Sequence, residues 1–69
     1  MTDRLDNRLK EIRGELGLTQ AQLAEAVGVT RKTINTVENG VFVPSTLLAL
    51  KIARAVRRPV EALFTIASD

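Results

Sequence analysis

Residues 30–37 carry two cations, one amide and three hydroxyl groups but no carboxylate. Arg31 and Lys32 supply the positive charge, and Asn35 follows one turn later if the segment is helical. Groups of these kinds donate hydrogen bonds to phosphates and to the base edges exposed in the major groove of DNA. The segment therefore indicates a surface that binds nucleic acid.

Two short helices joined by a tight turn are predicted to position this surface. Thr19 can cap the first helix, and Gln22 three residues later completes a capping box. Gly28 can end that helix in a left-handed conformation, Thr30 can cap the second helix, and Asn39-Gly40 can stop it. A polar, cationic helix held across a shorter one is a helix-turn-helix. The residues expected to face inward are Leu23, Ala24, Val27, Ile34 and Val37.

A further helix is predicted ahead of this pair, at residues 6–17. Asp6 or Asn7 can cap it, and Gly17 can end it. Its apolar stripe would consist of Leu5, Leu9, Ile12 and Leu16.

Two more helices are predicted in the second half of the chain, at residues 46–57 and 60–66. Ser45 can cap the former, and Pro59 suits the start of the latter because its missing donor would be unpaired there anyway. Residues 67–69 are expected to form a frayed tail. The expected apolar faces contain Leu47, Leu50 and Ala53, with Leu48, Ile52 and Val56 beside them, and then Val60, Leu63 and Phe64.

Length and composition favour one small helical domain. A chain of 69 residues buries one modest core, so we expect a single domain spanning residues 1–69 with its core at about residues 6–66. Phe42 and Phe64 are its only aromatic residues, whereas Ala and Leu are abundant. This composition suits an all-α bundle of five helices better than a sheet.

Several classes of function are disfavoured. The chain has no cysteine or histidine, so it cannot form a disulfide and it lacks the usual ligands of a zinc site. It has no glycine-rich phosphate loop, and the polar N-terminus does not resemble a signal peptide. We therefore expect a cytoplasmic protein that is not an enzyme, with no cofactor, metal, membrane contact or evident small-molecule ligand.

The charge distribution is uneven although the net charge is only +2. Residues 31–58 contain six cations and one acid, Glu38. A solvated surface would explain such an excess, and cations near the end of the helix at 46–57 suit its dipole. Together with the motif, the excess favours DNA as the partner.

The block at residues 18–40 resembles the helix-turn-helix of the phage Cro and repressor type, also called the xenobiotic-response-element family. The similarity continues through Pro44-Ser45, residues 48–53 and Leu63-Phe64, and covers about residues 7–66. It implies a lambda-repressor-like fold in which the second and third helices form the motif. The matching motif residues are Gln20, Ala24, Gly28, Ile34 and Val37.

The resemblance also implies roles for individual residues, each of which could alternatively be a solvated polar side chain. Residues that read bases would lie on the outer face of the recognition helix at 31–39, and residues that bind phosphates would lie around it. The base contacts would be Arg31, Lys32, Asn35 and Thr36, and the phosphate contacts Thr19, Gln20, Thr30, Thr33 and Asn39.

An ion pair between Arg13 and Glu38 is implied as well, and it would clamp the first helix to the recognition helix. The end of the fourth helix and the linker after the recognition helix depart from the family. Arg57 stands where relatives usually carry glycine, so it must adopt a left-handed conformation or the turn must differ. Val41, Phe42 and Val43 replace polar linker residues, and they either pack over their own core or form a dimer contact.

These features predict a sequence-specific, double-stranded DNA-binding transcriptional regulator. We expect a repressor that binds a palindromic operator as a homodimer, with half-sites one DNA turn, roughly 34–36 Å, apart. The alternative is a protein-interaction module, such as an antitoxin or adaptor, on the same fold. Binding of single strands or RNA is disfavoured because the chain lacks an aromatic stacking platform.

Overall fold

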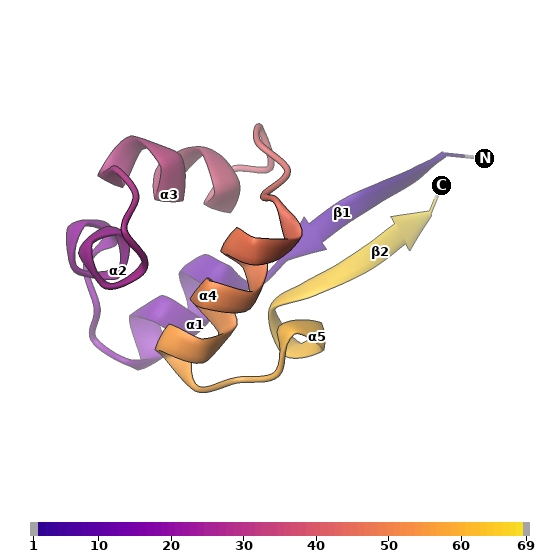
Figure 1. The fold of residues 1–69 in the computed structure, drawn as a ribbon. Coiled ribbons are helices and arrows are strands. Elements are labelled where there is room, and N and C mark those ends of the chain that lie inside the picture. Colours follow the sequence, from indigo (N-terminus) through magenta and orange to yellow (C-terminus); the bar gives the residue numbers. More distant parts are fainter. Residues whose placement is uncertain (1, 69) are drawn as a thin grey trace.

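The computed structural model describes residues 2–68 and shows a cluster of helices from which a two-stranded sheet extends (Figure 1). The elements in chain order are β1 (Asp3–Asn7), α1 (Leu9–Glu15), α2 (Gln20–Val27), α3 (Arg31–Glu38), α4 (Thr46–Val56), α5 (Val60–Leu63) and β2 (Phe64–Ser68).

One aliphatic core lies between the helices. Each of the helices α1 to α5 contributes at least one side chain to it, and Phe64 packs against its edge only half-buried. The residues at its centre have at most 1% of their surface exposed: Leu9, Leu23, Ile34, Val37, Ile52, Val56 and Leu63.

Side-chain caps fix where three of the helices begin. The Thr19 hydroxyl accepts from the Gln22 amide at 3.0 Å while the Gln22 side chain accepts from the Thr19 amide at 2.8 Å, which is the expected capping box. Thr30 and Ser45 cap α3 and α4 through the amides three residues on. The expected starts of α2, α3 and α4 are therefore confirmed.

The expectation of an all-α bundle was wrong, because the two ends of the chain form an antiparallel sheet. β1 pairs with β2 in a register that sets Asp3 opposite Ser68 and Asn7 opposite Phe64. The Ser68 hydroxyl also donates to the Asp3 carboxylate at 2.6 Å. The run Phe64-Thr65-Ile66 is rich in residues that favour strands, and pairing with β1 satisfies the backbone groups on the edge that faces β1.

The sheet shortens both flanking helices. α1 begins at Leu9 rather than at residue 6. Asn7 lies just before the helix, and its side-chain oxygen accepts a hydrogen bond from the Leu9 amide at 3.1 Å. Leu5 lies in β1, and Leu16 is 41% exposed just after α1. α5 ends at Leu63, and Ala67 and Ser68 belong to β2 rather than to a frayed tail. Residue 69 of that predicted tail lies outside the described residues.

The apolar face of α4 is narrower than predicted. Leu47 and Leu50 are 63% and 53% exposed, so the expectation that they face the core was wrong. The buried stripe follows the four-residue spacing of Leu48, Ile52 and Val56 instead. α4 packs against α2 and α5, and its side chains in or against the core are those of this stripe together with Ala53 and Ala55.

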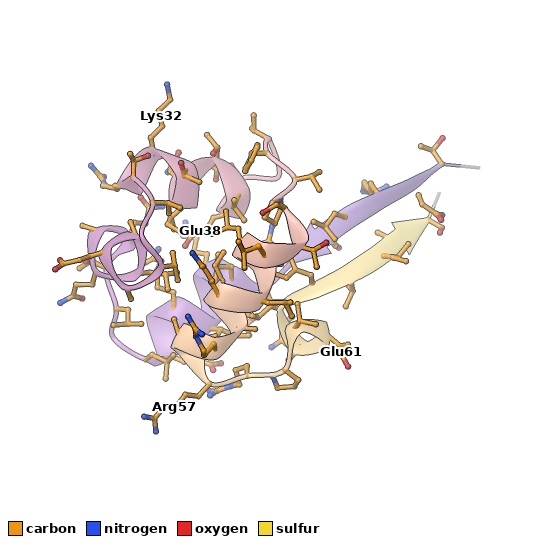
Figure 2. The ribbon with its side chains drawn as sticks, in the orientation of Figure 1. Lys32, Glu38, Arg57 and Glu61 are labelled. Atoms are coloured by element: carbon orange, nitrogen blue, oxygen red, sulfur yellow. The ribbon has the colours of Figure 1, made fainter. Side chains whose placement is uncertain are left out.

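Arg57 ends α4 in the left-handed region, with φ 56° and ψ 42°. In this conformation the amides of Arg57 and Arg58 donate back to the carbonyls of Arg54 and Ala53. Figure 2 shows the Arg57 side chain extending away from the fold. The backbone thus forms the left-handed turn expected for glycine, although the residue at this position is an arginine.

Replacing Arg57 with glycine is expected to raise the free energy of unfolding by about 0.5–1 kcal/mol, because glycine adopts this conformation without the Cβ strain. Arg54→Gly is the matched control. It lies within the last turn of α4, where glycine should lower the free energy of unfolding by about 1 kcal/mol. Urea melts of both variants test the sign, and a loss in both would show that Arg57 is not strained.

Candidate nucleic-acid interface

The recognition helix α3 presents one apolar and one polar face. Ile34 and Val37 are 0% and 1% exposed and anchor the inner face in the core. Arg31, Lys32 and Asn35 are exposed on the other side. Figure 2 shows Lys32 projecting outward from α3. The sequence prediction for these faces therefore agrees with the structure.

Most of the other polar side chains of α3 are engaged within the helix. The Thr36 hydroxyl donates to the Thr33 carbonyl at 2.9 Å, and Nδ2 of the Asn39 side chain donates to Oδ1 of Asn35 at 3.2 Å. Thr30 and Thr33 share a hydroxyl contact of 3.1 Å. Within residues 2–68, the side chains of Arg31 and Lys32 make no hydrogen bond or ion pair, so their donors are available to a partner.

The Glu38 carboxylate joins three helices beneath this surface. Arg13 of α1 donates to it through Nε at 2.6 Å and Nη2 at 3.2 Å, and Gln20 of α2 donates through Nε2 at 3.0 Å. The Glu38 side chain is 1% exposed and that of Arg13 is 15% exposed. Arg13 also donates to the Leu18 carbonyl at 2.8 Å. The structure thus brings Arg13 and Glu38 together in the geometry of a two-point ion pair.

This arrangement removes the one acid of α3 from the outer face. Hydrogen bonding to Glu38 raises the pKa of Arg13, although burial of the guanidinium opposes the shift. Arg13 therefore remains charged, and its guanidinium lies against the Glu38 carboxylate as a counter-ion. In consequence, the exposed charge of α3 comes from Arg31 and Lys32 alone.

The start of α2 faces the start of α3 across a shallow hollow of about 540 Å³. Thr19, Gln20 and Arg31 line it together with Arg13. The first amides of a helix and nearby cations attract anions. The hollow thus groups two of the predicted phosphate contacts with one predicted base contact. Gln20 directs its amide nitrogen to Glu38, but that nitrogen carries a second hydrogen.

Asn7 makes a long-range contact that the sequence did not indicate. Its Nδ2 donates to the Val37 carbonyl at 2.9 Å while its Oδ1 accepts from the Leu9 amide. It therefore links β1, the start of α1 and the end of α3. Its capping potential was visible in the sequence, but a contact across thirty residues leaves no local pattern.

The linker after α3 does not cover the core. The predicted alternative in which its apolar residues pack over their own core was therefore wrong. Val41, Phe42 and Val43 are 78%, 46% and 67% exposed. The amides of Val41 and Phe42 both donate to the Thr36 carbonyl, at 3.0 and 3.2 Å. The backbone of the linker is thus bound to α3 while its apolar side chains face outward.

The described part of the chain offers no other obvious chemistry. Between residues 2 and 68, no three carboxylate, histidine or cysteine side chains are grouped as metal ligands. No helix in the same range has both the length and the apolar run that a membrane crossing requires.

Comparison with known proteins gives consistent results. A family model described as Helix-turn-helix matches residues 9–63, which run from the start of α1 to the end of α5. An uncharacterized HTH-type transcriptional regulator of Bacillus subtilis, YgzD, is 43% identical over 65 residues, which cover 94% of this chain and 98% of the relative. An HTH-type transcriptional regulator of Methanothermobacter thermautotrophicus is 52% identical over 62 residues, which cover 88% and 90%.

A solved structure shares the arrangement. The restriction-modification controller protein C.AhdI from Aeromonas hydrophila superposes with a TM-score of 0.76 at 34% identity. The match covers 80% of this chain and 83% of the controller protein.

Proposed function

Since the chain belongs to the Cro/C1-type helix-turn-helix family of DNA-binding transcriptional regulators, we propose that it reads a specific duplex sequence as a homodimer and represses transcription by occupying that site. The outer face of α3 carries this proposal. That face holds two unpaired cations on a helix that is anchored by buried Ile34 and Val37 and by the Glu38 contacts.

The residues divide between two kinds of DNA contact. Arg31 and Lys32 at the start of α3 reach base edges, where either can donate to guanine. Asn35 and Thr36 lie one turn later and face adjacent bases. The phosphate contacts are made by the residues around the two helix starts and at the end of α3: Thr19, Gln20, Thr30, Thr33 and Asn39.

The proposed dimer contact lies beyond the end of α3, next to the sheet. Val43 and Ile66 are 67% and 74% exposed and line one hollow of about 510 Å³ together with Leu5. Apolar residues grouped in this way are stabilised when a second surface covers them. Of the three linker residues predicted as dimer contacts, Val43 is the one that lines this hollow. In a two-fold symmetric dimer, this same surface would be buried on both subunits.

Selection of binders from a random duplex pool at physiological salt tests the function. Enrichment of a palindrome whose half-sites lie about one turn apart, roughly 34–36 Å, is the expected result. Retention without sequence preference, together with a steep loss of binding in salt, would show only the phosphate interaction. Protein partners such as a toxin would then become the better assignment for the exposed linker.

Arg31→Ala is expected to weaken binding to the selected site by about 1–3 kcal/mol and to relax the preference at one base position. Arg54→Ala is the matched control, because Arg54 is an exposed cation on α4, away from α3. It should leave the base preference unchanged. Titration of both variants on the selected site and on single-base variants measures the effect. Equal weakening by Arg31→Ala on every sequence would make Arg31 a phosphate contact.

A further inference from the structure

An apolar pocket lies against α3, on the side where the linker returns. It measures about 320 Å³ and is lined by Lys32, Thr33, Thr36, Val41 and Phe42; we call it the α3–linker pocket. The three α3 residues are spaced so that they share one face of the helix. Lys32 carries a long apolar stem and each threonine carries a methyl group, and the linker adds a valine and a phenylalanine to the lining.

The position of the linker side chains is fixed by the backbone. Gly40 turns the chain with φ 73°, and its amide donates to the Val37 carbonyl at 3.1 Å. The next two amides, of Val41 and Phe42, share the Thr36 carbonyl. Val41 and Phe42 are consequently held beside α3, although 78% and 46% of their surfaces are exposed.

The surroundings of the pocket identify the kind of partner that covers it. Lys32 lines the pocket, and Arg31 is the residue before it in the chain. Residues 30–37 contain no acidic side chain. Glu38 follows but is buried against Arg13. An apolar pocket with a cationic border and no exposed acid on its helix suits an apolar group carried by a polyanion. On the major-groove edges of DNA, that group is the C5-methyl of thymine.

Thr36 supports the same occupant. Its hydroxyl hydrogen is donated to the Thr33 carbonyl, so the side chain offers a methyl group and acceptor lone pairs rather than a donor. Thr36 therefore cannot donate a hydrogen bond to an acceptor atom on a base edge. A thymine methyl is instead matched by the threonine methyl and by the ring of Phe42.

We propose that the α3–linker pocket receives the C5-methyl of a thymine, so that Phe42 is a specificity-determining residue of this regulator. The proposal rests on the DNA-binding function proposed above. It assigns Val41 and Phe42 to the DNA surface and leaves Val43 to the dimer contact. The predicted dimer role of Val41 and Phe42 becomes the competing outcome of the test.

The test uses the duplex selected with the wild-type protein. Each thymine is replaced in turn by deoxyuridine, which removes the C5-methyl and keeps every hydrogen-bonding group. At one thymine of each half-site, uracil is expected to raise the Kd about fourfold per half-site, the factor that burial of one methyl supplies. With Phe42→Ala, the Kd on the thymine duplex should rise and the uracil penalty at that position should disappear.

Leu47→Ala is the matched control, because Leu47 is an exposed apolar residue on α4 that does not line the pocket. It should keep the full uracil penalty. A thermal melt of Phe42→Ala verifies folding, since its half-exposed ring contributes little to the core.

The outcomes separate this proposal from the function beneath it. Sequence-specific binding with no uracil penalty, or with a penalty that persists undiminished in Phe42→Ala, overturns the pocket assignment alone. If Phe42→Ala instead shifts the protein from dimer to monomer in sedimentation while the uracil scan is flat, Phe42 is a protein contact. Absence of any sequence preference in the wild-type protein overturns both proposals.

Discussion

Replacing Glu38 with alanine is expected to lower the free energy of unfolding by about 3 kcal/mol, because it removes one partner of a buried ion pair. The Arg13 guanidinium would keep its place against α1 and the Leu18 carbonyl but lose both bonds to the carboxylate. Gln20 would lose an acceptor as well. A charge that is 15% exposed is then left without its counter-ion.

Glu11→Ala is the matched control, because Glu11 pairs with Arg8 at 3.0 Å through side chains that are more than half exposed. Water replaces such a partner at little cost, so the urea midpoint should stay unchanged within error. A loss of less than half the expected value in Glu38→Ala would show that water enters around Arg13. The comparison thus measures what burial adds to an ion pair of the same chemical type.

Leu23→Ala should also lower the free energy of unfolding by about 3 kcal/mol, within the range of about 2–5 found for buried leucines. Leu23 is 0% exposed on α2, which packs on both α3 and α4. For a chain of this size, each 1 kcal/mol corresponds to roughly 4–8 °C in the melting temperature, so the loss should be evident in a thermal scan.

Leu47→Ala makes the same chemical change at a residue that is 63% exposed. It should alter the free energy of unfolding by no more than about 0.5 kcal/mol. Similar losses in the two variants would mean that Leu47 is covered in solution. In that case its surface on α4, rather than the Val43 surface, would be the first place to look for the dimer contact.

The helix-turn-helix could be predicted in detail because its determinants are local. The capping box of Thr19 and Gln22, the left-handed Gly28 and the Thr30 cap each act within four residues, and all are present in the structure. The family model covers this block and extends to residue 63. Short-range signals of this kind are legible without any knowledge of the tertiary structure.

The sheet could not be predicted from the same signals. Leu5 lies four residues before Leu9, so it fits a helical stripe, and nothing near it in sequence indicates a partner strand. Its partner is Ile66, and the match to the family ends before that residue. The helical period also failed to predict which side chains of α4 are buried. Leu47 and Leu50 fit the spacing of an apolar helix face, but the spacing does not reveal whether another element covers that face.

The candidate site shows the same division. The outward direction of Arg31 and Lys32 follows from the period of α3, whereas the hydrogen bond from Asn7 to Val37 and the return of the linker onto Thr36 depend on the folded chain. These long-range contacts decide the position of the α3–linker pocket. The residues of that pocket were visible in the sequence, but their grouping was not.

The pairing of β1 with β2 also fixes an order of events in folding. Its residue pairs join positions 3–7 to positions 64–68, so the loop that it closes contains all five helices. Closing a loop of that length costs more chain entropy than forming any helical turn. Contacts within a helix join residues close in sequence, so they can form early in folding. During synthesis, the sheet cannot form until residues 64–68 have left the ribosome. Until then residues 3–7 lack their partner strand, and their unpaired backbone groups can pair with other chains.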